Sequence, residues 1–480
     1  MQKSELLGTA KIPALLLRFS VPAIIGMLVN ALYNIVDRIF IGQGVGPLGI
    51  AGATITFPLM LIQMAFGMLI GLGANSLISI SLGEQKRERA ETILGNAFFL
   101  LVCIAVSLSA LGLLFLTPLL KLFGASETIL PYARSYASII LFGTLFQAIG
   151  MGMNNFIRGE GDPKTAMKTM LLGAILNTIL DPIFIFVFKW GVGGAALATV
   201  ISQGASAVWV LAYYFGGRSQ LKIRLHNLLP RKDIVLKILA VGSAPFAMQL
   251  ASALLNAIVN NQLTAYGGDL AVSAMGILFS IGMLFFMPIF GVNQGMQPIV
   301  GYNFGAKSYH RVVHAAYIAI GAGSVFVILG FLSIQLFPRA LVSLFSGSSA
   351  ELLDLGAYAI RRYFLMMPVI GFQMIASGYF QAVGKPKQAM FLTLSRQIIL
   401  LIPLFLILPR FLGLDGIWLA PPIADLLSAA LTGIFFYREL RNLKLQGDAS
   451  MTAAAAPADV DALTAAAAPA EAALSRGTKK

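Results

Sequence analysis

Long apolar windows recur along the whole chain, and short polar connections separate them. A window of about 20 apolar residues, when helical, matches the thickness of the hydrocarbon core of a bilayer. The pattern therefore predicts twelve transmembrane helices and an all-α, polytopic membrane protein. We expect these helices at residues 14–44, 53–82, 93–116, 133–157, 167–188, 192–215, 236–265, 271–300, 314–336, 357–382, 390–409 and 415–437.

The two halves of the chain repeat each other at an offset of 222 to 223 residues. Residues 20–22 (SVP) match 243–245 (SAP), and 161–164 (GDPK) match 384–387 (GKPK). A fixed internal period is a strong sign of a repeated structural unit. Six helices per half return the chain to its starting side, so the repeat is parallel, with its pseudo-twofold axis along the membrane normal.

These features divide the chain into four parts. We expect an N-lobe of helices 1 to 6 (1–215), a connection (216–235), a C-lobe of helices 7 to 12 (236–440) and a tail (441–480). Ala and Pro dominate the tail, where TAAAAPAD at 452 is followed by TAAAAPAE at 464. So few kinds of apolar side chain build no core, and we expect this cytoplasmic tail to be disordered.

The distribution of charge predicts the orientation of the helices in the membrane and leaves the predicted class, a polytopic membrane protein, unchanged. Only 11% of the residues are charged and 58% are hydrophobic, and the net charge of +14 lies mostly in the connections. The connections after even-numbered helices hold most of the Lys and Arg, for example at 86–89 and 218–232. By the positive-inside rule, these connections and both termini are cytoplasmic. We therefore expect a protein of the cytoplasmic (inner) membrane and no binding of nucleic acid.

Asp37 lies inside the first apolar window. A carboxylate at the bilayer centre costs roughly 3 kcal/mol or more, so such a residue generally faces the bundle interior and serves function. Two structural interpretations stay open: an ion pair with Arg38, or a position close enough to the interface to be solvated.

Helices 5 and 6 add polar groups at a matching depth. Asn177 and Asp181 are spaced i, i+4 and share one face of helix 5, with Pro182 directly after them, while helix 6 carries Thr199. At about 1.5 Å per residue, Asp37, Asp181 and Thr199 all lie roughly 10–12 Å below the outer ends of their helices. The sequence thus predicts that three helices bring polar side chains to one level of the N-lobe.

The C-lobe differs at the matching positions. Asn260 corresponds to Asp37 and Leu404 corresponds to Asp181. Helices 7 and 8 carry no acid at mid-depth, which argues against a cation site in the C-lobe.

Four segments carry a family resemblance. They are NIVDRIFIGQ (34–43), RGEGDPK (158–164), LNTILDP (176–182) and NQGMQPIVGYNFGA (293–306). Through them the chain resembles the multidrug and toxic compound extrusion (MATE) family, in its bacterial MepA-like branch, over roughly residues 10–440. The resemblance implies two six-helix lobes and export of cationic amphiphiles in exchange for protons or sodium ions. It also implies a cation site in the N-lobe, formed by Asp37, Asn177, Asp181 and Thr199 with Tyr136 on helix 4.

The coupling ion stays open between two candidates. Carboxylate, amide and hydroxyl oxygens at Asp37, Asn177, Asp181 and Thr199 suit Na⁺, whereas two neighbouring carboxylates can instead share a proton. No other cofactor is expected. For the drug, we expect a cavity between the lobes, lined by Asn30, Asn154 and Met170, because Met side chains adapt to different ligands.

Two other functional classes are compatible with parts of the sequence. A flippase for lipid-linked precursors has a related architecture. Its anionic headgroup would favour basic residues within the cavity, whereas the N-lobe has acids at depth. Arg396 on helix 11 is a basic residue in an apolar helix and keeps this alternative open. An ATP-driven pump or an enzyme is not expected, because GYNFGAKS (301–308) lacks the glycine–lysine spacing of a nucleotide-binding loop. We therefore expect a monomeric secondary transporter that binds small organic cations and lipid but no nucleotide.

Overall fold

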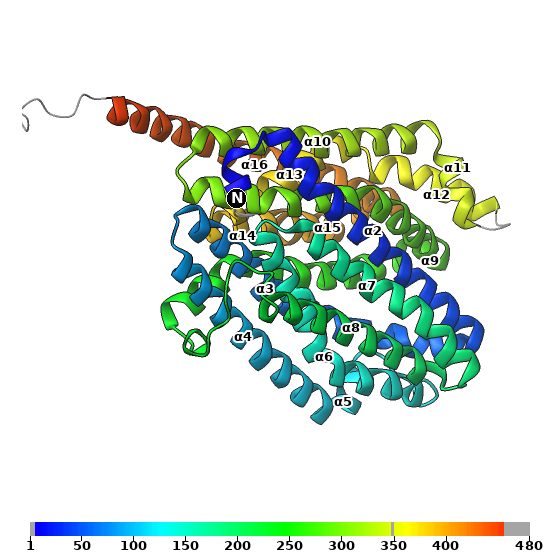
Figure 1. Ribbon diagram of the computed structural model, residues 1–480. Coiled ribbons are helices and arrows are strands. Elements are labelled where there is room, and N and C mark those ends of the chain that lie inside the picture. The colour runs from blue at the N-terminus through cyan, green and yellow to red at the C-terminus, as the bar shows by residue number, and fades with distance from the viewer. Residues whose placement is uncertain (1–4, 347–349, 456–480) are drawn as a thin grey trace, which may run out of the picture.

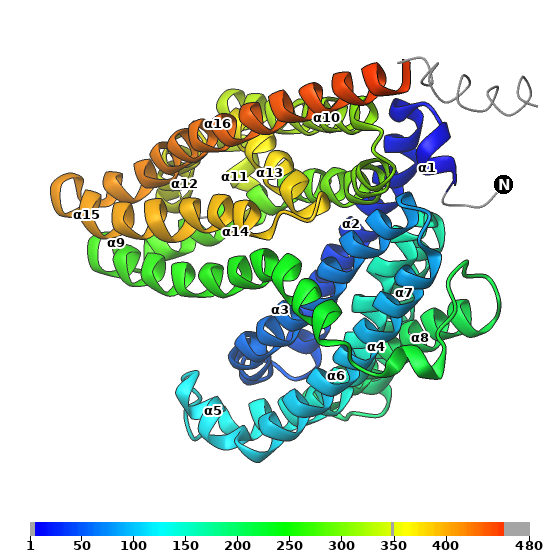
Figure 2. The same cartoon turned by 90° about the vertical axis from the view of Figure 1, so that its left-hand side faces the viewer.

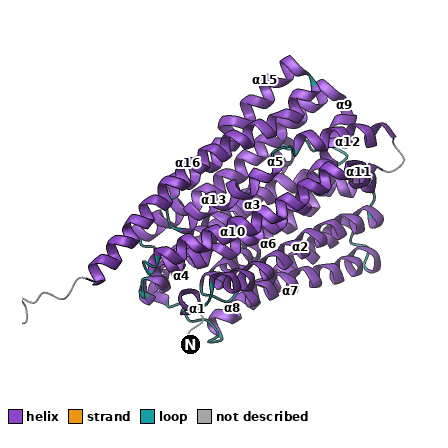
Figure 3. Cartoon of the chain, turned by 90° about the horizontal axis from the view of Figure 1, so that it is seen from above, coloured by secondary structure: helices purple, strands orange, loops and turns teal. Residues whose placement is uncertain are grey.

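The computed structural model describes residues 5–346 and 350–455, and every regular element within them is a helix (Figures 1 and 3). The first half of the chain comprises α1 (Glu5–Thr9), α2 (Ile12–Gly44), α3 (Pro47–Gly83), α4 (Arg87–Leu114), α5 (Leu116–Leu122), α6 (Leu130–Gly159), α7 (Pro163–Pro182), the π-helix η1 (Ile183–Val187) and α8 (Gly191–Phe215). The second half comprises the 3₁₀-helix η2 (Leu225–Leu228), α9 (Lys232–Gly305), α10 (Tyr309–Leu336), α11 (Pro338–Ser346), α12 (Ala350–Tyr363), α13 (Met367–Ala382), α14 (Pro386–Leu394), the π-helix η3 (Ser395–Leu401), α15 (Ile402–Leu412) and α16 (Leu414–Ala455).

The predicted all-α membrane fold is confirmed. In the described residues, eleven helical spans are long and apolar enough to cross a membrane, and a bent pair of helices supplies the twelfth. The bent pair is α12 and α13, which meet at an angle of 52° where we expected one continuous helix at 357–382. α9 contains two spans, because the left-handed backbone of Gly268 breaks it between Lys232–Gly268 and Leu270–Gly305.

The repeat is visible in the backbone of the turns. Turn positions with positive φ recur at the spacing found in the sequence, and a positive φ is a conformation that favours glycine. Such a turn therefore keeps its shape in both halves although the neighbouring side chains differ. The matching pairs are Gly46 (φ 87°) with Gly268 (61°), Gly161 (96°) with Gly384 (70°), Gly191 (58°) with Gly413 (57°), and Gln85 (60°) with Lys307 (56°).

The lobes meet at one end of the bundle and diverge toward the other (Figure 2). A Cβ on Gly242 would lie 1.7 Å from the carbonyl oxygen of Leu69, so only glycine permits this approach of α9 to α3. Asn75 Nδ2 donates to Gln297 Oε1 at 3.4 Å across the same seam, from positions 222 residues apart in the repeat. The connection between α3 and α4, which contains Lys86, lies at the end of the bundle where the lobes meet. The lobes therefore touch at the end that is rich in Lys and Arg.

The N-terminal helix α1 strengthens this closed end. The carbonyl of Leu7, a buried residue, accepts hydrogen bonds from Asn303 Nδ2 (2.9 Å) and Arg311 (3.2 Å), both from the C-lobe. Arg311 also donates to the carbonyl of Ala10 at 2.7 Å. The segment that leads into the first helix of the N-lobe is therefore anchored to the C-lobe.

The predicted tail differs from the structure in part. α16 continues to Ala455, so residues 441–455 are helical where we expected disorder from 441 onward. The rest of the predicted tail, residues 456–480, lies outside the described residues.

Candidate functional site

Asp181 is the second-to-last residue of α7. Pro182 follows it and ends α7, and the chain continues as the π-helix η1, so the hydrogen-bonding pattern of the helix changes shortly after the carboxylate. Proline provides no backbone donor, and π-helical segments often occur at functional sites. The carboxylate itself is fully buried (0% exposed), as expected for an acid that faces the bundle interior.

Asn177 links this acid to α8. Its Nδ2 donates to Asp181 Oδ1 at 3.3 Å and lies 3.4 Å from Thr199 Oγ1. Asn177 and Thr199 are 2% and 6% exposed. The predicted convergence of helices 5 and 6 at this depth is therefore observed, and one amide bridges both neighbours.

Asp37 completes the cluster from α2, which packs along α7. Its carboxyl group lies close enough to that of Asp181 for the two to interact directly, and its side chain is half-buried. Two carboxylates so close together in a medium of low dielectric constant repel each other unless a proton or a cation neutralises part of their charge. The arrangement therefore favours the presence of a proton or a cation beside the two carboxyl groups.

Two oxygen atoms of the cluster are available to a cation or a proton. Asn177 Oδ1 and Asp181 Oδ2 are buried and have no hydrogen-bond partner among the described residues. A buried polar atom without a partner costs roughly 1–3 kcal/mol, which a bound cation or an added proton relieves. The oxygen-only donor set is compatible with H⁺ and with a hard metal ion such as Na⁺.

Tyr136 lies beside the cluster on α6. It is buried and packs with Ile41, Ile185, Ala195 and Ala196 in a small apolar group. Ile41 is one turn beyond Asp37 on α2, and Ala195 is one turn before Thr199 on α8. The structure thus places Tyr136 one helical turn from the polar cluster, and its part in a cation site stays a prediction.

The three predicted substrate-lining residues occupy different environments. Asn30 is exposed on α2, and Met170 is half-buried and contacts Gly26 of α2. Asn154 is buried, and both ends of its side-chain amide form hydrogen bonds. Nδ2 donates to the carbonyl of Ala166 at 2.8 Å, and Oδ1 accepts from Arg158 at 2.9 Å. Asn154 therefore ties α6 to α7 in this conformation, and the drug-lining role of all three residues stays a prediction.

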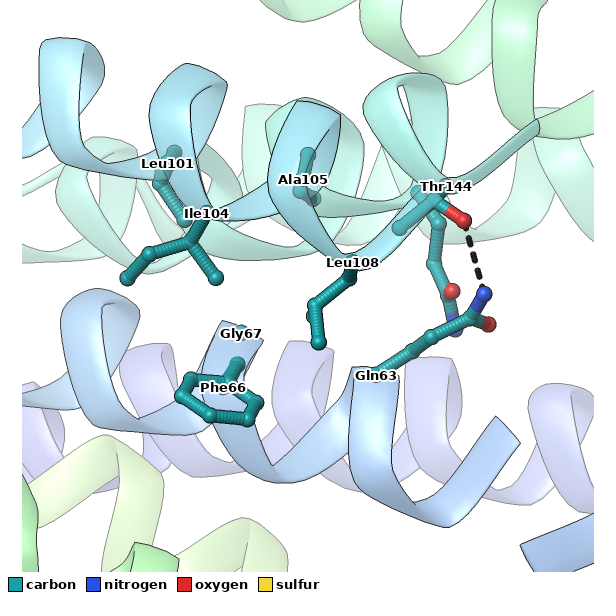
Figure 4. A pocket seen from close by; sticks show the side chains of 10 residues that line it. Gln63, Phe66, Gly67, Leu101, Ile104, Ala105, Leu108 and Thr144 are labelled. Carbon is teal, nitrogen blue, oxygen red and sulfur yellow. Dashed lines mark hydrogen bonds between the residues drawn. The ribbon is translucent and has the colours of Figure 1, made fainter. Parts of the chain in front are cut away.

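The N-lobe also contains a small pocket between α3, α4 and α6 (Figure 4). Gln63 Nε2 donates to Thr144 Oγ1 at 2.7 Å at its polar end, and apolar side chains such as Leu101 and Leu108 line the remainder. No acid lines this pocket, so we assign it no part in cation binding.

The sequence analysis did not identify a buried ion pair in the C-lobe. Arg396 Nε lies 2.6 Å from Asp425 Oδ1, which joins the π-helix η3 to α16. The prediction for the C-lobe rested on helices 7 and 8, whereas Asp425 is on helix 12. A signal for the pair was present in the sequence: Arg396 and Asp425 lie on two consecutive apolar helices that a short turn joins.

Comparison with known proteins identifies the family. The MatE family model matches residues 22–183 and again residues 245–407, which together make up most of the chain. The two matches start 223 residues apart, in agreement with the repeat found in the sequence. The family model thus recognises each lobe separately.

Individual relatives agree with this assignment. The chain is 26% identical over 424 residues to the multidrug export protein MepA of Staphylococcus aureus (strain MSSA476), covering 88% of this chain and 93% of MepA. It is 28% identical over 439 residues to an FAD transporter of Shewanella oneidensis, covering 87% and 93% of the two chains. Among solved structures, the MATE multidrug transporter DinF-BH is 42% identical, with a TM-score of 0.86 and coverage of 92% of this chain and 99% of DinF-BH.

The twelve-span helical fold, the duplicated family match and the full-length structural likeness lead to the same assignment. The chain is a multi-pass membrane transporter of the MATE family, similar to MepA.

Proposed function

We propose that this transporter exports cationic, amphiphilic drugs in exchange for H⁺ or Na⁺ by alternating access. The carboxylate cluster of Asp37 and Asp181, with Asn177 and Thr199, is the coupling site. The observation that carries this proposal is the pair of interacting carboxylates beside buried oxygens that lack partners. Such a cluster has a strong demand for one positive charge, and either the ion or the nearby drug supplies it.

The contacts between the lobes support a direction for the cycle. The lobes touch at the Lys- and Arg-rich end, which the positive-inside rule assigns to the cytoplasm. We infer that this conformation is open toward the outside, with the N-lobe cluster in the outward half. From outside, an ion enters the cluster, neutralises it and weakens the hold on a cationic drug, which then leaves.

Export follows from reciprocal linkage. The ion and the drug must favour different states of the transporter, so that binding of one lowers the affinity for the other. When the cluster is exposed to the cytoplasm, it loses its ion, regains negative charge and attracts the next drug. The membrane potential adds about 2.3 kcal/mol per elementary charge per 100 mV, so the number of exchanged charges decides how strongly voltage assists export.

The relatives support drugs over lipid-linked precursors as cargo. Both MepA and DinF-BH carry multidrug names. The acids at depth in the N-lobe also suit a cation better than an anionic headgroup, so the flippase alternative is not favoured. We further propose that the protein works as a monomer in the cytoplasmic membrane, with both termini inside and without nucleotide.

Transport in proteoliposomes tests the proposal. Purified transporter is reconstituted, and movement of the fluorescent cation ethidium is recorded while a pH gradient and a sodium gradient are imposed separately. We expect one of the two gradients to drive ethidium in the wild type and in Asp354→Asn, a control at an exposed acid. The same gradient should drive no ethidium in Asp181→Asn. Equal ethidium transport by Asp181→Asn and the wild type would refute the coupling site.

A further inference from the structure

The buried ion pair of the C-lobe has no role in the proposed cycle. Arg396 Nε and Asp425 Oδ1 lie 2.6 Å apart, and the two side chains are 25% and 3% exposed. Taking two charges out of water is costly even when they pair, so a buried ion pair gives little net stability over an apolar pair. Inside a membrane helix bundle, ionisable residues usually mark a functional position.

The pair sits at the repeat equivalent of the helix interface that forms the N-lobe site. α14, η3 and α15 correspond to α7 and η1, and α16 corresponds to α8. At the 223-residue offset, Leu404 takes the position of Asp181 and Leu400 that of Asn177. Arg396 lies eight residues before Leu404, and Asp425 lies three residues after Pro422, the counterpart of Thr199. The C-lobe charges thus occupy the same interface, one to two turns nearer the closed end.

Both interfaces share a further feature, because each contains a π-helix. In the N-lobe, η1 begins two residues after Asp181, and in the C-lobe Arg396 is the second residue of η3. Ser252 of α9 donates to Gln397 Oε1 at 3.2 Å and so ties the neighbouring position of η3 to the first span of the C-lobe. Each lobe therefore has a charged side chain in or close to a π-helix at this interface.

The charges themselves differ. Among the described side chains, the N-lobe cluster holds two carboxylates and buried oxygens of Asn177 and Asp181 without partners, whereas the C-lobe acid already has a cation beside it. Tyr363, at the end of α12, is the other ionisable group that interacts with both Arg396 and Asp425. The C-lobe site therefore has the composition of an acidic cation site in which a side chain supplies the cation.

We propose that Arg396 is a tethered cation that occupies the C-lobe counterpart of the coupling site. By neutralising Asp425 permanently, it restricts ion exchange to the N-lobe and so sets the number of ions exchanged per drug. This inference rests on the proposed function. Removal of the guanidinium, as in Arg396→Met, leaves Asp425 to take one exchangeable monovalent cation, H⁺ or Na⁺, in its place.

The test is the number of positive charges exchanged per ethidium, measured in proteoliposomes from the voltage at which net ethidium flux reverses under fixed ion gradients. We expect Arg396→Met to exchange one more charge than the wild type. Arg396→Lys keeps a tethered cation, and Arg396→Met/Asp425→Asn removes the acid, so both should keep the wild-type number. An unchanged number in Arg396→Met, with transport intact, refutes the tethered-cation role and leaves the pair with a structural role only.

Thermal unfolding provides a second test, which does not require the variant to transport ethidium. Thermal unfolding of purified Arg396→Met in detergent is followed against pH and sodium concentration. We expect lower pH or added sodium to stabilise Arg396→Met, but neither the wild type nor Arg396→Met/Asp425→Asn to the same degree. A variant that stays unfolded, or unfolds alike, at every pH and sodium concentration argues against an exchangeable cation. If no ion gradient drives ethidium in the wild type, the proposed function fails, and the unfolding measurement alone decides whether Arg396 occupies a cation site.

Discussion

The N-lobe and the C-lobe share their helices and turns but not their buried charges. Matching positive-φ turns and two matches to one family model show that the scaffold was kept. On that scaffold, the N-lobe places two interacting acids at the interface of α2 and α7, and the C-lobe places an acid against a base between η3 and α16. The comparison shows that the scaffold of a lobe does not determine its chemistry; a few side chains at one helix interface do.

The difference also separates two kinds of buried charge. In the C-lobe, Arg396 and Asp425 satisfy each other within the protein, so both charges contribute to one folded arrangement. In the N-lobe, two carboxylates lie next to each other, and we propose that a cation from outside the chain neutralises part of their charge. We therefore expect substitutions of the N-lobe acids to affect transport more than stability, and substitutions of the C-lobe pair to affect stability as well.

Besides the loss expected for Asp181→Asn, the largest effect is expected at Asp37, where Asp37→Asn introduces the amide that the C-lobe carries at Asn260. The change keeps the size of the side chain but fixes its charge at zero, so the cluster no longer exchanges a cation. Gradient-driven ethidium efflux should fall by about 100-fold, the upper range of typical coupling factors. Efflux is normalised to reconstituted protein, and thermal unfolding checks the fold. Efflux near the wild-type rate would mean that Asp181 alone carries coupling.

The next effect concerns stability of the C-lobe. Removing one partner of a buried ion pair typically costs about 3–5 kcal/mol, because the other charge stays buried and alone. We expect Asp425→Asn to lower the free energy of unfolding by an amount in this range, measured by denaturant unfolding in detergent. The control is Asp354→Asn, which breaks the Arg339–Asp354 pair, where both side chains are largely exposed (74% and 64%) and the expected cost is about 0–1 kcal/mol. Equal costs for the two variants would contradict the comparison.

How much of this arrangement follows from the sequence depends on the kind of signal. Bilayer thickness imposes the length of every span, so twelve helices and the repeat were predictable from apolar windows alone. The N-lobe cluster was predictable because acids in long apolar windows are conspicuous and because helix rise fixes their depth. Asp181, Asn177 and Thr199 lie together as that reasoning predicted.

Other features need three-dimensional information. The Arg396–Asp425 pair depends on the rotational register of two helices, which sequence spacing does not give. The two π-helices were not predictable from the sequence, because Pro182 alone indicated no more than a kink. The 52° bend between α12 and α13 has a signal in the sequence, Pro368 at the start of α13, which we did not use. The anchoring of α1 by Arg311 depends equally on tertiary packing, because it joins residues about 300 positions apart in the chain.

A smaller effect is expected at the neutral ligands of the N-lobe cluster. Asn177→Ala and Thr199→Ala each remove one neutral hydrogen-bonding group, worth about 1 kcal/mol, or roughly a fivefold loss of ion affinity. Ion-driven efflux should need a several-fold steeper gradient but should persist. Thr178→Ala on the same helix is the matched control, because its hydroxyl bonds the carbonyl of Ala174 instead. Loss of efflux as complete as in Asp37→Asn would show that the amide or hydroxyl is indispensable.

The exposed candidates for drug contact should change selectivity more than coupling. Asn30→Ala and Met170→Ala alter α2 and α7 on sides where the side chain is exposed or half-buried. We expect changes of a few-fold in the relative transport of different cationic drugs at an unchanged ion dependence, measured as a panel of efflux rates. Asn154→Ala is the contrasting variant, because it cuts the tie between α6 and α7 and should lower stability. An unchanged panel for Asn30→Ala or Met170→Ala removes that residue from the drug site.

The smallest effect is expected at the C-terminal extension, which the N-lobe lacks, because α8 ends at Phe215 while α16 continues to Ala455. The apolar span of α16 ends at Leu443, and the buried residues Phe436, Leu440 and Leu443 lie before or at this point. Glu439, one residue before Leu440, also bonds Lys385 at 2.6 Å and ties α16 to the start of α14. Deleting residues 450–480 leaves all these contacts in place, so normalised efflux should stay within about twofold of the wild type and the free energy of unfolding within about 0.5 kcal/mol. Truncation before Phe436 removes the contacts and should prevent folding. If the shorter deletion abolished efflux in a protein that still folds, the tail would have a role that neither its composition nor the contacts of α16 account for.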